Sequence, residues 1–342
     1  MTIKDIARRS GYAVGTVSRV LNGHPDVSDA ARAKILSVVA DTGFRPNDNA
    51  RHLKQREGSG IAVIVKGARN LLFAGILEEM QSLIKSAGRS AAVYYLDEDE
   101  DEVEQAVRVS RELKPLGILF LGGNQNNFKE RFGAVKCPCV LVTTRADTMG
   151  FKNLSSVSTD DAEGAAQAIR SLAAAGHRRI GVIGGHVRGA GGPGHANTSQ
   201  TRLFGCRRGF LESGAPFDEA RQFVETRFSM RGGYEAANDL LDRCPDLTAL
   251  FAMSDVMAIG ALRALRDRGL RVPEDISLMG YDGIEQAEYC VPRLSTIRQQ
   301  GAQLARRGVE ILLRQAAGGG SAVHEIVPFQ LVPGESVRNV NR

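Results

Sequence analysis

The sequence lacks long apolar runs: no stretch reaches the roughly 18 residues of a membrane-spanning helix. The opening MTIKDIARRSGYAVG also lacks the apolar centre of a secretory signal, so we expect a cytoplasmic protein. Cysteine is scarce, with five in 342 residues, and the odd count and scattered positions do not suggest a disulfide framework. Cys137 and Cys139, at the start of an expected strand, are interpreted as ordinary thiols because zinc needs more ligands than this stretch offers.

Motifs for catalysis and cofactor binding are missing too. The six histidines are scattered, and there is no Ser-His-Asp set, P-loop or metal-spaced cluster, so we predict neither an enzyme nor a metal site. GAGGPG (189–194) matches GxGxxG formally, but it opens no helix, and it is interpreted as a loop near a cleft mouth. DEDEDEVEQ (97–105) lacks the glycine of a calcium loop and is interpreted as the acidic first turn of a helix. No cofactor is expected.

Positive charge is concentrated at the N-terminal end. The chain has a formal net charge of +5, from 44 basic and 39 acidic residues. Residues 1–60 contain ten Lys or Arg and six Asp or Glu, an excess of four positive charges, and the other 34 basic and 33 acidic residues nearly balance. We therefore expect only the N-terminal part to meet a polyanion.

Three short helices are predicted within residues 1–43. Thr2 caps the first, which ends at Ser10-Gly11; the second runs from about Val14 to Leu21, and Asn22-Gly23 stops it. The third follows a Val27-Ser28 entry and ends at Gly43. The apolar positions assigned to the shared core are Ile3, Ile6, Ala7, Val17, Val20, Leu21, Ala31, Ile35, Leu36, Val38 and Val39.

This order of helices predicts a helix-turn-helix unit that binds DNA. A helix that enters a major groove about 12 Å wide must be narrow and polar on its outer face. The second helix carries Thr16, Ser18 and Arg19 on that face. The alternative is a small three-helix bundle with a solvated polar face. After it, NDNARHLK (47–54) predicts a short helix that forms only against a partner, with Leu53 as a wedge for the minor groove or as an incidental residue of a linker.

From Ile61 the pattern changes to apolar runs of strand length separated by amphipathic helices. The runs are IAVIV, SAAVYYL, GILFLGG, CVLVTT, IGVIGG, ALFAMSD and ISLMGYD. This alternation predicts parallel sheets covered by helices on both faces, in two units of about 61–159 and 160–291. The late helix GAQLARRGVEILLRQAA and the strand HEIVPFQLV are expected to return to these units. A cleft at the strand ends is the natural ligand site.

The N-terminal motifs TVSRVLNG and RPNDNAR closely resemble the headpiece and hinge helix of the lactose-repressor/galactose-repressor (LacI/GalR) family of bacterial transcription regulators. Two residues depart from the family pattern: Ala13 stands where a capping Ser is usual, and Val14-Gly15 offers no polar side chain to bases. The resemblance implies an all-α helix-turn-helix headpiece with a hinge helix over residues 1–57. Its implied DNA contacts are Thr2, Val14, Gly15, Thr16, Ser18, Arg19, Asn22, Asn47, Arg51 and Leu53.

The resemblance continues through GHRRIGVIGG, FAMSDVMAIGALRALRDRGLRVPEDISLMGYD and PRLSTIRQ. It implies that residues 61–342 form an α/β, two-lobed domain like the periplasmic binding proteins. Lobe 1 would comprise 61–159 and 292–320, and lobe 2 would comprise 160–291 and 321–342. The implied effector contacts are Phe73, Asp160, Glu163, Arg202, Phe228, Ser254 and Asp282. Ser254 and Gly283 both depart from the usual residues.

The combined expectation is a homodimeric repressor that binds a pseudo-palindromic operator in double-stranded DNA. A small-molecule effector, a sugar or a derivative, would control the affinity. Because the chain ends at ESVRNVNR without a heptad extension, a dimer is expected in place of a coiled-coil tetramer. The alternatives are a sugar-binding protein without a regulatory role, and an α/β enzyme.

Overall fold

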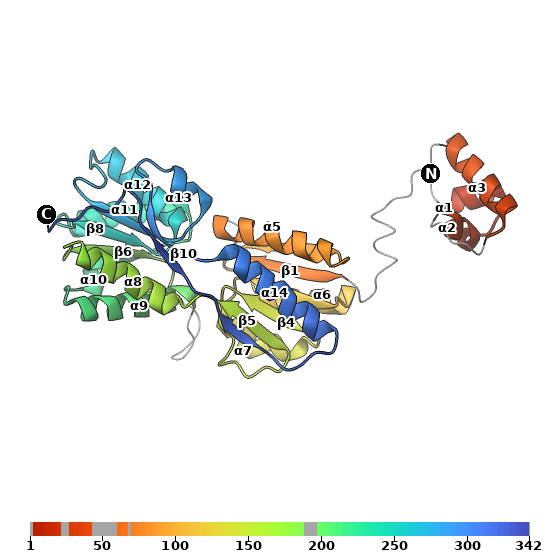
Figure 1. The fold of residues 1–342 in the computed structure, drawn as a ribbon, viewed down its shortest axis with the longest axis horizontal. Coiled ribbons are helices and arrows are strands. Elements are labelled where there is room, and N and C mark those ends of the chain that lie inside the picture. The colour runs from red at the N-terminus through yellow and green to blue at the C-terminus, as the bar shows by residue number, and fades with distance from the viewer. Residues whose placement is uncertain (1–2, 22–26, 43–59, 68–69, 188–196, 342) are drawn as a thin grey trace. The chain divides into compact units, whose positions relative to one another are not determined.

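The computed structural model describes residues 3–21, 27–42, 60–67, 70–187 and 197–341. The chain divides into two compact units, Met1–Glu57 and Gly58–Arg342. Figure 1 shows a small helical unit at the N-terminal end of the chain and a larger α/β unit made by the rest. A search of the described residues finds no helix with the length and apolar character to cross a membrane.

The N-terminal unit contains the three predicted helices, α1 (Ile3–Ser10), α2 (Val14–Leu21) and α3 (Asp29–Thr42). Ile6, Val17 and Ile35, one from each helix, are fully buried at the centre. The prediction for Leu36 was wrong, because its side chain is 46% exposed. Ile35 takes the inward position on α3, and the next residue lies about 100° further round the helix, beyond the buried stripe.

The first lobe of the larger unit is a sheet of six parallel strands in the order β11-β5-β4-β3-β1-β2. Its strands are β1 (Ile61–Lys66), β2 (Ala91–Leu96), β3 (Gly117–Leu121), β4 (Cys139–Val142), β5 (Leu154–Ser158) and β11 (His324–Ile326). Its helical segments are α5 (Leu71–Ser86), α6 (Glu102–Leu113), α7 (Gln125–Arg131), η1 (Phe132–Ala134) and α14 (Gly301–Ala316).

Helices cover both faces of this sheet (Figure 1), and the side chains of β1 show why, because alternate residues are buried on opposite faces. Val63 and Val65 belong to the apolar cluster that contains α5 and α14, whereas Ala62 and Ile64 belong to the cluster that contains α6 and α7. Successive side chains of a strand point to opposite faces. A strand that is apolar at every position, as IAVIV is, must therefore lie between two layers of helices.

The second lobe repeats the arrangement, with the strand order β12-β10-β9-β8-β6-β7 and only β12 antiparallel to its neighbour. Its strands are β6 (Ile180–Gly184), β7 (Phe223–Glu225), β8 (Ala249–Ala252), β9 (Ser277–Asp282), β10 (Ser295–Arg298) and β12 (Gln330–Val332). Its helices are α8 (Asp161–Ala174), α9 (Thr198–Ser213), α10 (Glu219–Gln222), α11 (Met230–Arg243), α12 (Asp255–Asp267) and α13 (Glu285–Tyr289).

Residues 292–342 are divided between the two lobes differently from the expectation. β10, expected in lobe 1, joins the second sheet beside β9, and β11, expected in lobe 2, joins the first sheet beside β5. The single strand expected over HEIVPFQLV is therefore two strands, β11 and β12, in different sheets. Short strands of this kind carry no local signal of which sheet they join, because pairing partners decide it. The chain passes between the lobes after β5, after β10 and after β11.

Candidate functional site

In the N-terminal unit, α2 carries the described part of the predicted DNA-binding set. Gly15 and Arg19 are exposed, and Thr16 is partly exposed beside them. The carbonyl of Ala13 accepts the backbone N–H groups of Thr16 and Val17, at 2.9 and 3.1 Å, so the first turn closes on backbone contacts. Two further members of the set lie in α2, namely Val14 and Ser18. The others, like the loop 189–194, fall outside the described residues: Thr2, Asn22, Asn47, Arg51 and Leu53.

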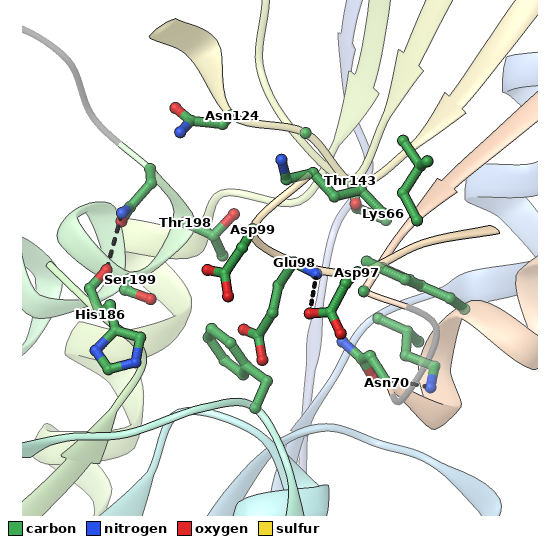
Figure 2. Close-up of a pocket in the computed structure, with 18 of the residues that line it drawn as sticks. Lys66, Asn70, Asp97, Glu98, Asp99, Asn124, Thr143, His186, Thr198 and Ser199 are labelled. Carbon is green, nitrogen blue, oxygen red and sulfur yellow. Dashed lines mark hydrogen bonds between the residues drawn. The ribbon is translucent and has the colours of Figure 1, made fainter. Parts of the chain in front are cut away.

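In the larger unit, a cavity of about 500 Å³ lies between the lobes. Its lining comes from the carboxyl ends of strands in both sheets, which is where open parallel sheets place their ligands. The lining residues are Lys66, Gly67, Asn70, Leu72, Phe73, Tyr95, Leu96, Asp97, Glu98, Asp99, Gly122, Gly123, Asn124, Thr143, His186, Asn197, Thr198, Ser199, Arg202, Phe228, Asp282 and Gln299. Figure 2 shows Asp97, Glu98 and Asp99 on one wall and His186, Thr198 and Ser199 on the wall opposite.

Four of the seven predicted effector contacts meet in this cavity. Phe73 comes from α5, Arg202 from α9, Phe228 from the segment before α11, and Asp282 from the end of β9. They are separated by up to about 200 residues in sequence and come from both lobes. Two aromatic faces, one guanidinium and one carboxylate are a set that suits a ring bearing hydroxyl groups.

Arg202 is held rigidly by its neighbours. Its Nε donates to Asp161 Oδ1 at 2.8 Å, one terminal nitrogen donates to the carbonyl of Met253, and the other lies 3.4 Å from Asp282 Oδ1. The guanidinium also stacks on the ring of Tyr281, 3.8 Å from its centroid. Carboxylates on both sides keep the side chain charged although it is 4% exposed. A ligand therefore meets a preorganised cation whose orientation costs nothing on binding.

Asp282 shows two features typical of a ligand-binding residue. Its backbone has φ of 115°, a region that residues other than glycine rarely adopt. Its Oδ1 accepts from Gln299 Nε2 at 2.8 Å, but its fully buried Oδ2 has no hydrogen-bond partner among the described residues. A buried carboxylate oxygen without a donor is costly. A ligand hydroxyl or amine that donates to Oδ2 would remove that cost.

Burial also sets the ionisation of this region. Burial raises the pKa of Asp282 to about 6, although Arg202 lowers it. Below the cavity, burial and the neighbouring Asp282 raise the pKa of Asp255 to about 8. Asp255 accepts from Thr296 Oγ1 at 2.6 Å and from the backbone N–H of Ile284 at 2.9 Å. It therefore braces the strand ends that present Asp282.

The lobe 1 side of the cavity has its own fixed polar centre. Lys66, at the end of β1, donates to Glu102 Oε2 at 2.8 Å and to the carbonyl of Glu100. Glu102 is fully buried and also accepts from the backbone N–H of Asn124 and from Asn127 Nδ2, at 2.5 and 2.8 Å. These contacts tie the loops after β1, β2 and β3 together, so the floor of lobe 1 is built before any ligand arrives.

The other three predicted contacts lie outside the lining of the cavity. Asp160 caps α8 by accepting from the backbone N–H of Glu163 at 3.0 Å, and Glu163 pairs with Arg170 and Arg208 on the outer side of α8 and α9. Ser254 is fully buried as the cap of α12, where it accepts from Met257 N at 3.2 Å. All three side chains are engaged by helix ends or helix surfaces, which explains why they do not reach the cavity.

The sequence analysis missed much of the lining because most of it is loop. Asp97–Asp99 were included in the first turn of a helix, but α6 begins at Glu102 with Asp101 as its cap, and the three preceding acids line the cavity. Asn70, Asn124, Thr143, His186 and Gln299 were not singled out either. One signal was available: each of them follows closely after a strand, at the edge where the cleft was expected.

Neither metal binding nor nucleophilic catalysis is indicated by the described residues. They contain no group of three or more Asp, Glu, His or Cys side chains placed to hold a metal ion. Ser156 Oγ does lie 2.9 Å from His324 Nδ1, and burial lowers the pKa of that imidazole although Asp147 acts to raise it. Ser156 is only 2% exposed and accepts from the backbone N–H of Ala146, so it joins β5 to its neighbours and is closed to a substrate.

Comparisons with known proteins agree with this arrangement. Residues 2–47 match the family "bacterial regulatory proteins, lacI family", and residues 169–337 match the periplasmic binding protein-like domain. The HTH-type transcriptional regulator MalR of Clostridium butyricum is 34% identical over 99% of this chain and 100% of its own. The ribose operon repressor of Haemophilus influenzae is 32% identical over 92% of this chain and 91% of its own.

Solved structures show the same fold. The transcriptional regulator CelR in complex with cellobiose superposes with a TM-score of 0.70 and 28% identity, over 98% of this chain and 99% of that one. The lac repressor dimer bound to operator and an anti-inducer superposes with a TM-score of 0.76 and 24% identity, over 99% of both chains. The chain has a helix-turn-helix unit at its N-terminal end, a two-lobed α/β domain after it in sequence, and a full-length relative at 34% identity. It therefore belongs to the lacI family of bacterial regulatory proteins.

Proposed function

We propose that this protein is a repressor whose operator affinity is set by a saccharide bound between its lobes. The observation that carries the proposal is the cavity that both sheets build, which is lined by buried Arg202, by two aromatic side chains and by Asp282, whose Oδ2 has no hydrogen-bond partner among the described residues. A saccharide supplies hydroxyl donors for the carboxylate and a ring face for Phe73 or Phe228. The relatives support it, since one solved relative is in complex with cellobiose.

The coupling to DNA follows from the connections between the lobes. A ligand that contacts both lobes favours one angle between them, and it shifts that equilibrium only by its difference in affinity for the two states. Moving a population from 1:99 to 99:1 requires about 10⁴-fold tighter binding to the favoured state. Lys66 and Arg202, fixed in opposite lobes, are the rigid points between which a ligand can act.

We propose that the protein works as a homodimer in the cytoplasm, on pseudo-palindromic sites. Two copies of α2, with Arg19 exposed, would enter successive major grooves about one helical turn apart. The excess positive charge of the first sixty residues would meet the phosphates. The predicted contacts outside the described residues, including Leu53 in the minor groove, belong to this proposal. We infer no catalytic role.

The test is an operator-binding assay with the full-length chain. Binding sites are selected from genomic fragments, and the affinity for one of them is measured by fluorescence anisotropy with and without cellobiose or ribose. We expect sequence-specific binding that a saccharide weakens. A chain that binds saccharide but shows no preference over bulk DNA would support the alternative, a sugar-binding protein without a regulatory role.

A further inference from the structure

Three consecutive acids form part of the cavity wall, in the loop between β2 and α6. Asp97, Glu98 and Asp99 all line the cavity, and Figure 2 shows Glu98 and Asp99 extending toward the wall that carries His186 and Thr198. Nothing in the helix that follows needs them, because Asp101 caps α6 with bonds of 2.8 and 3.0 Å to the N–H groups of Val103 and Glu104. Helix α6 therefore does not use the charges of these three acids.

The cations of the cavity are already engaged. Among its lining residues Lys66 and Arg202 are the permanent cations, against the four carboxylates of Asp97, Glu98, Asp99 and Asp282. Lys66 is paired with buried Glu102 at 2.8 Å, and Arg202 with Asp161 at 2.8 Å and with Asp282. His186 lies 3.7 Å from Glu225, a carboxylate that is not among the lining residues. An anionic ligand would thus meet an excess of negative charge and cations already bound to other groups.

One guanidinium from the other lobe faces the three acids. Arg227, in the segment between β7 and α11, lies 3.5 Å from Asp97 and 4.0 Å from Glu98, and it hydrogen-bonds to Asp99. Arg227 therefore connects the lobes at the cavity. It balances one of three negative charges, and burial together with Asp99 and Asp97 raises the pKa of Glu98 even though Arg227 lowers it.

A second, independent feature points to the same ligand chemistry. Asp282 is a lining residue of the cavity, and its buried Oδ2 atom lacks a hydrogen-bond partner in the described part of the chain. It needs a donor, and the three acids of the wall share one guanidinium, that of Arg227. An amine or a hydroxyl supplies donors, whereas a phosphate or a carboxylate supplies acceptors only.

We propose that Asp97, Glu98 and Asp99, with Arg227, form a charge filter that makes the cavity a receptor for neutral or amine-bearing saccharides and rejects phosphorylated or carboxylated ones. The inference rests on the proposed function and narrows its effector class. An ammonium group on the ligand takes a place among the acids that Arg227 only partly satisfies. A phosphate group adds like charge to them. Because the acids are partly exposed, salt weakens both effects.

The experiment measures dissociation constants of the full-length protein by calorimetry, for two sugar scaffolds in three charge forms. The neutral forms are glucose and cellobiose, the amine-bearing forms are glucosamine and the disaccharide of glucosamine, and the phosphorylated forms carry a 6-phosphate. On the scaffold that binds, we expect the amine to bind at least as tightly as the neutral sugar, and the phosphate at least tenfold more weakly at low salt. A phosphorylated form that binds as tightly as the neutral one overturns the filter.

Two variants test whether the acids and Arg227 select ligands by charge or only hold the lobes together. Asp97→Asn/Asp99→Asn and Arg227→Ala both remove ion pairs between the lobes, but they change the charge of the wall in opposite directions. The ratio of amine to neutral affinity should fall several-fold in the first and rise in the second. Arg231→Ala is the matched control, because Arg231 lies four residues later, in α11, and pairs within that helix with Glu235 at 2.9 Å.

Equal shifts of that ratio in the two variants, or no shift in either, would contradict the proposal. If no saccharide of any charge binds, the saccharide receptor itself fails, and the inference fails with it. Operator binding in the same preparation then shows whether the DNA-binding half of the proposed function survives.

Discussion

At the scale of single residues, the cavity contains a buried carboxylate, that of Asp282, which is only partly hydrogen-bonded by the described residues. Asp282 is fully buried, has a φ of 115° and keeps one carboxylate oxygen without a partner among the described residues. Strain and unsatisfied polar atoms lower the stability of a domain and persist at sites where a ligand relieves them. Arg202 beside it differs, because each nitrogen of its guanidinium has a hydrogen-bond partner: Asp161, the carbonyl of Met253, or Asp282.

The raised pKa of Asp282 predicts how effector binding depends on pH. The carboxylate accepts ligand donors when it is ionised, and burial raises its pKa to about 6 against the lowering effect of Arg202. Saccharide affinity should therefore fall as the pH is lowered through about 6 and level off above about 7. Calorimetry at pH 5, 6 and 7.5 measures this. Asp282→Asn should bind weakly with little pH dependence, and an equally steep profile in the variant would assign the titration to another group.

Arg19 provides the corresponding prediction for DNA. Its side chain is exposed on α2, so Arg19→Ala removes a guanidinium without opening the core. Operator affinity should fall by about 1–3 kcal/mol, the usual contribution of a bidentate base contact. Anisotropy titrations measure it, and saccharide affinity, determined in parallel, should stay the same. Unchanged operator affinity would exclude the proposed docking of α2.

At the scale of elements, glycines bring the paired helices of lobe 2 into close contact. A Cβ at Gly205 on α9 would overlap the carbonyl oxygen of Ala162 on α8, and one at Gly260 on α12 would overlap the carbonyl of Met230 on α11. The approach of α9 to α8 also bears on the site, because Arg202 on α9 donates to Asp161 on α8 at 2.8 Å.

Gly205→Ala should therefore affect both stability and binding. Overpacking of a tight contact costs typically about 1–3 kcal/mol, and here the neighbour is backbone, which cannot rotate away. We expect a lower melting temperature and weaker saccharide binding. Gly75→Ala on α5 is the control: nothing lies within 4 Å of its added Cβ, and helix propensity favours alanine by up to about 1 kcal/mol. Similar effects of the two changes would contradict the packing argument.

A substitution at Ser254 distinguishes a role as a helix cap from a role as an effector contact. Its hydroxyl accepts from Met257 N at the start of α12 and lies outside the cavity lining. Ser254→Ala should lower the free energy of unfolding by about 1 kcal/mol, as the loss of a helix cap does, and leave saccharide affinity unchanged. Chemical denaturation and calorimetry measure the two effects. A large loss of affinity with unchanged stability would place Ser254 among the effector contacts.

At the scale of the whole molecule, the two units face different partners and should respond differently to salt. The N-terminal sixty residues carry four of the five net positive charges, so DNA binding should release counterions. Operator affinity should fall by about 10³-fold or more between 50 and 200 mM salt if six or more phosphates are contacted. Affinity for a neutral saccharide should change little over the same range. A flat salt dependence of operator binding would contradict a phosphate-dominated interface.

The sequence alone determined the parts of this protein that depend on local pattern. Turn and cap signals in the sequence predicted α1, α2 and α3, and unbroken apolar runs predicted strands such as IAVIV; the structure has helices and a strand at these places. These signals arise between residues a few positions apart, where helix caps and strand alternation act. The resemblance to a known family added Arg202 and Asp282, which the structure places in one cavity.

Only the tertiary structure decided what depends on residues far apart in the chain. Leu36 is exposed because Ile35 faces the core, and β10 and β11 joined the sheets opposite to those expected because pairing partners decide where short strands lie. The acids Asp97–Asp99 line the cavity and contact Arg227 of the facing lobe, which lies some 130 residues later in the chain. Burial and long-range pairing depend on the whole fold, and so they appear only when both lobes are in place.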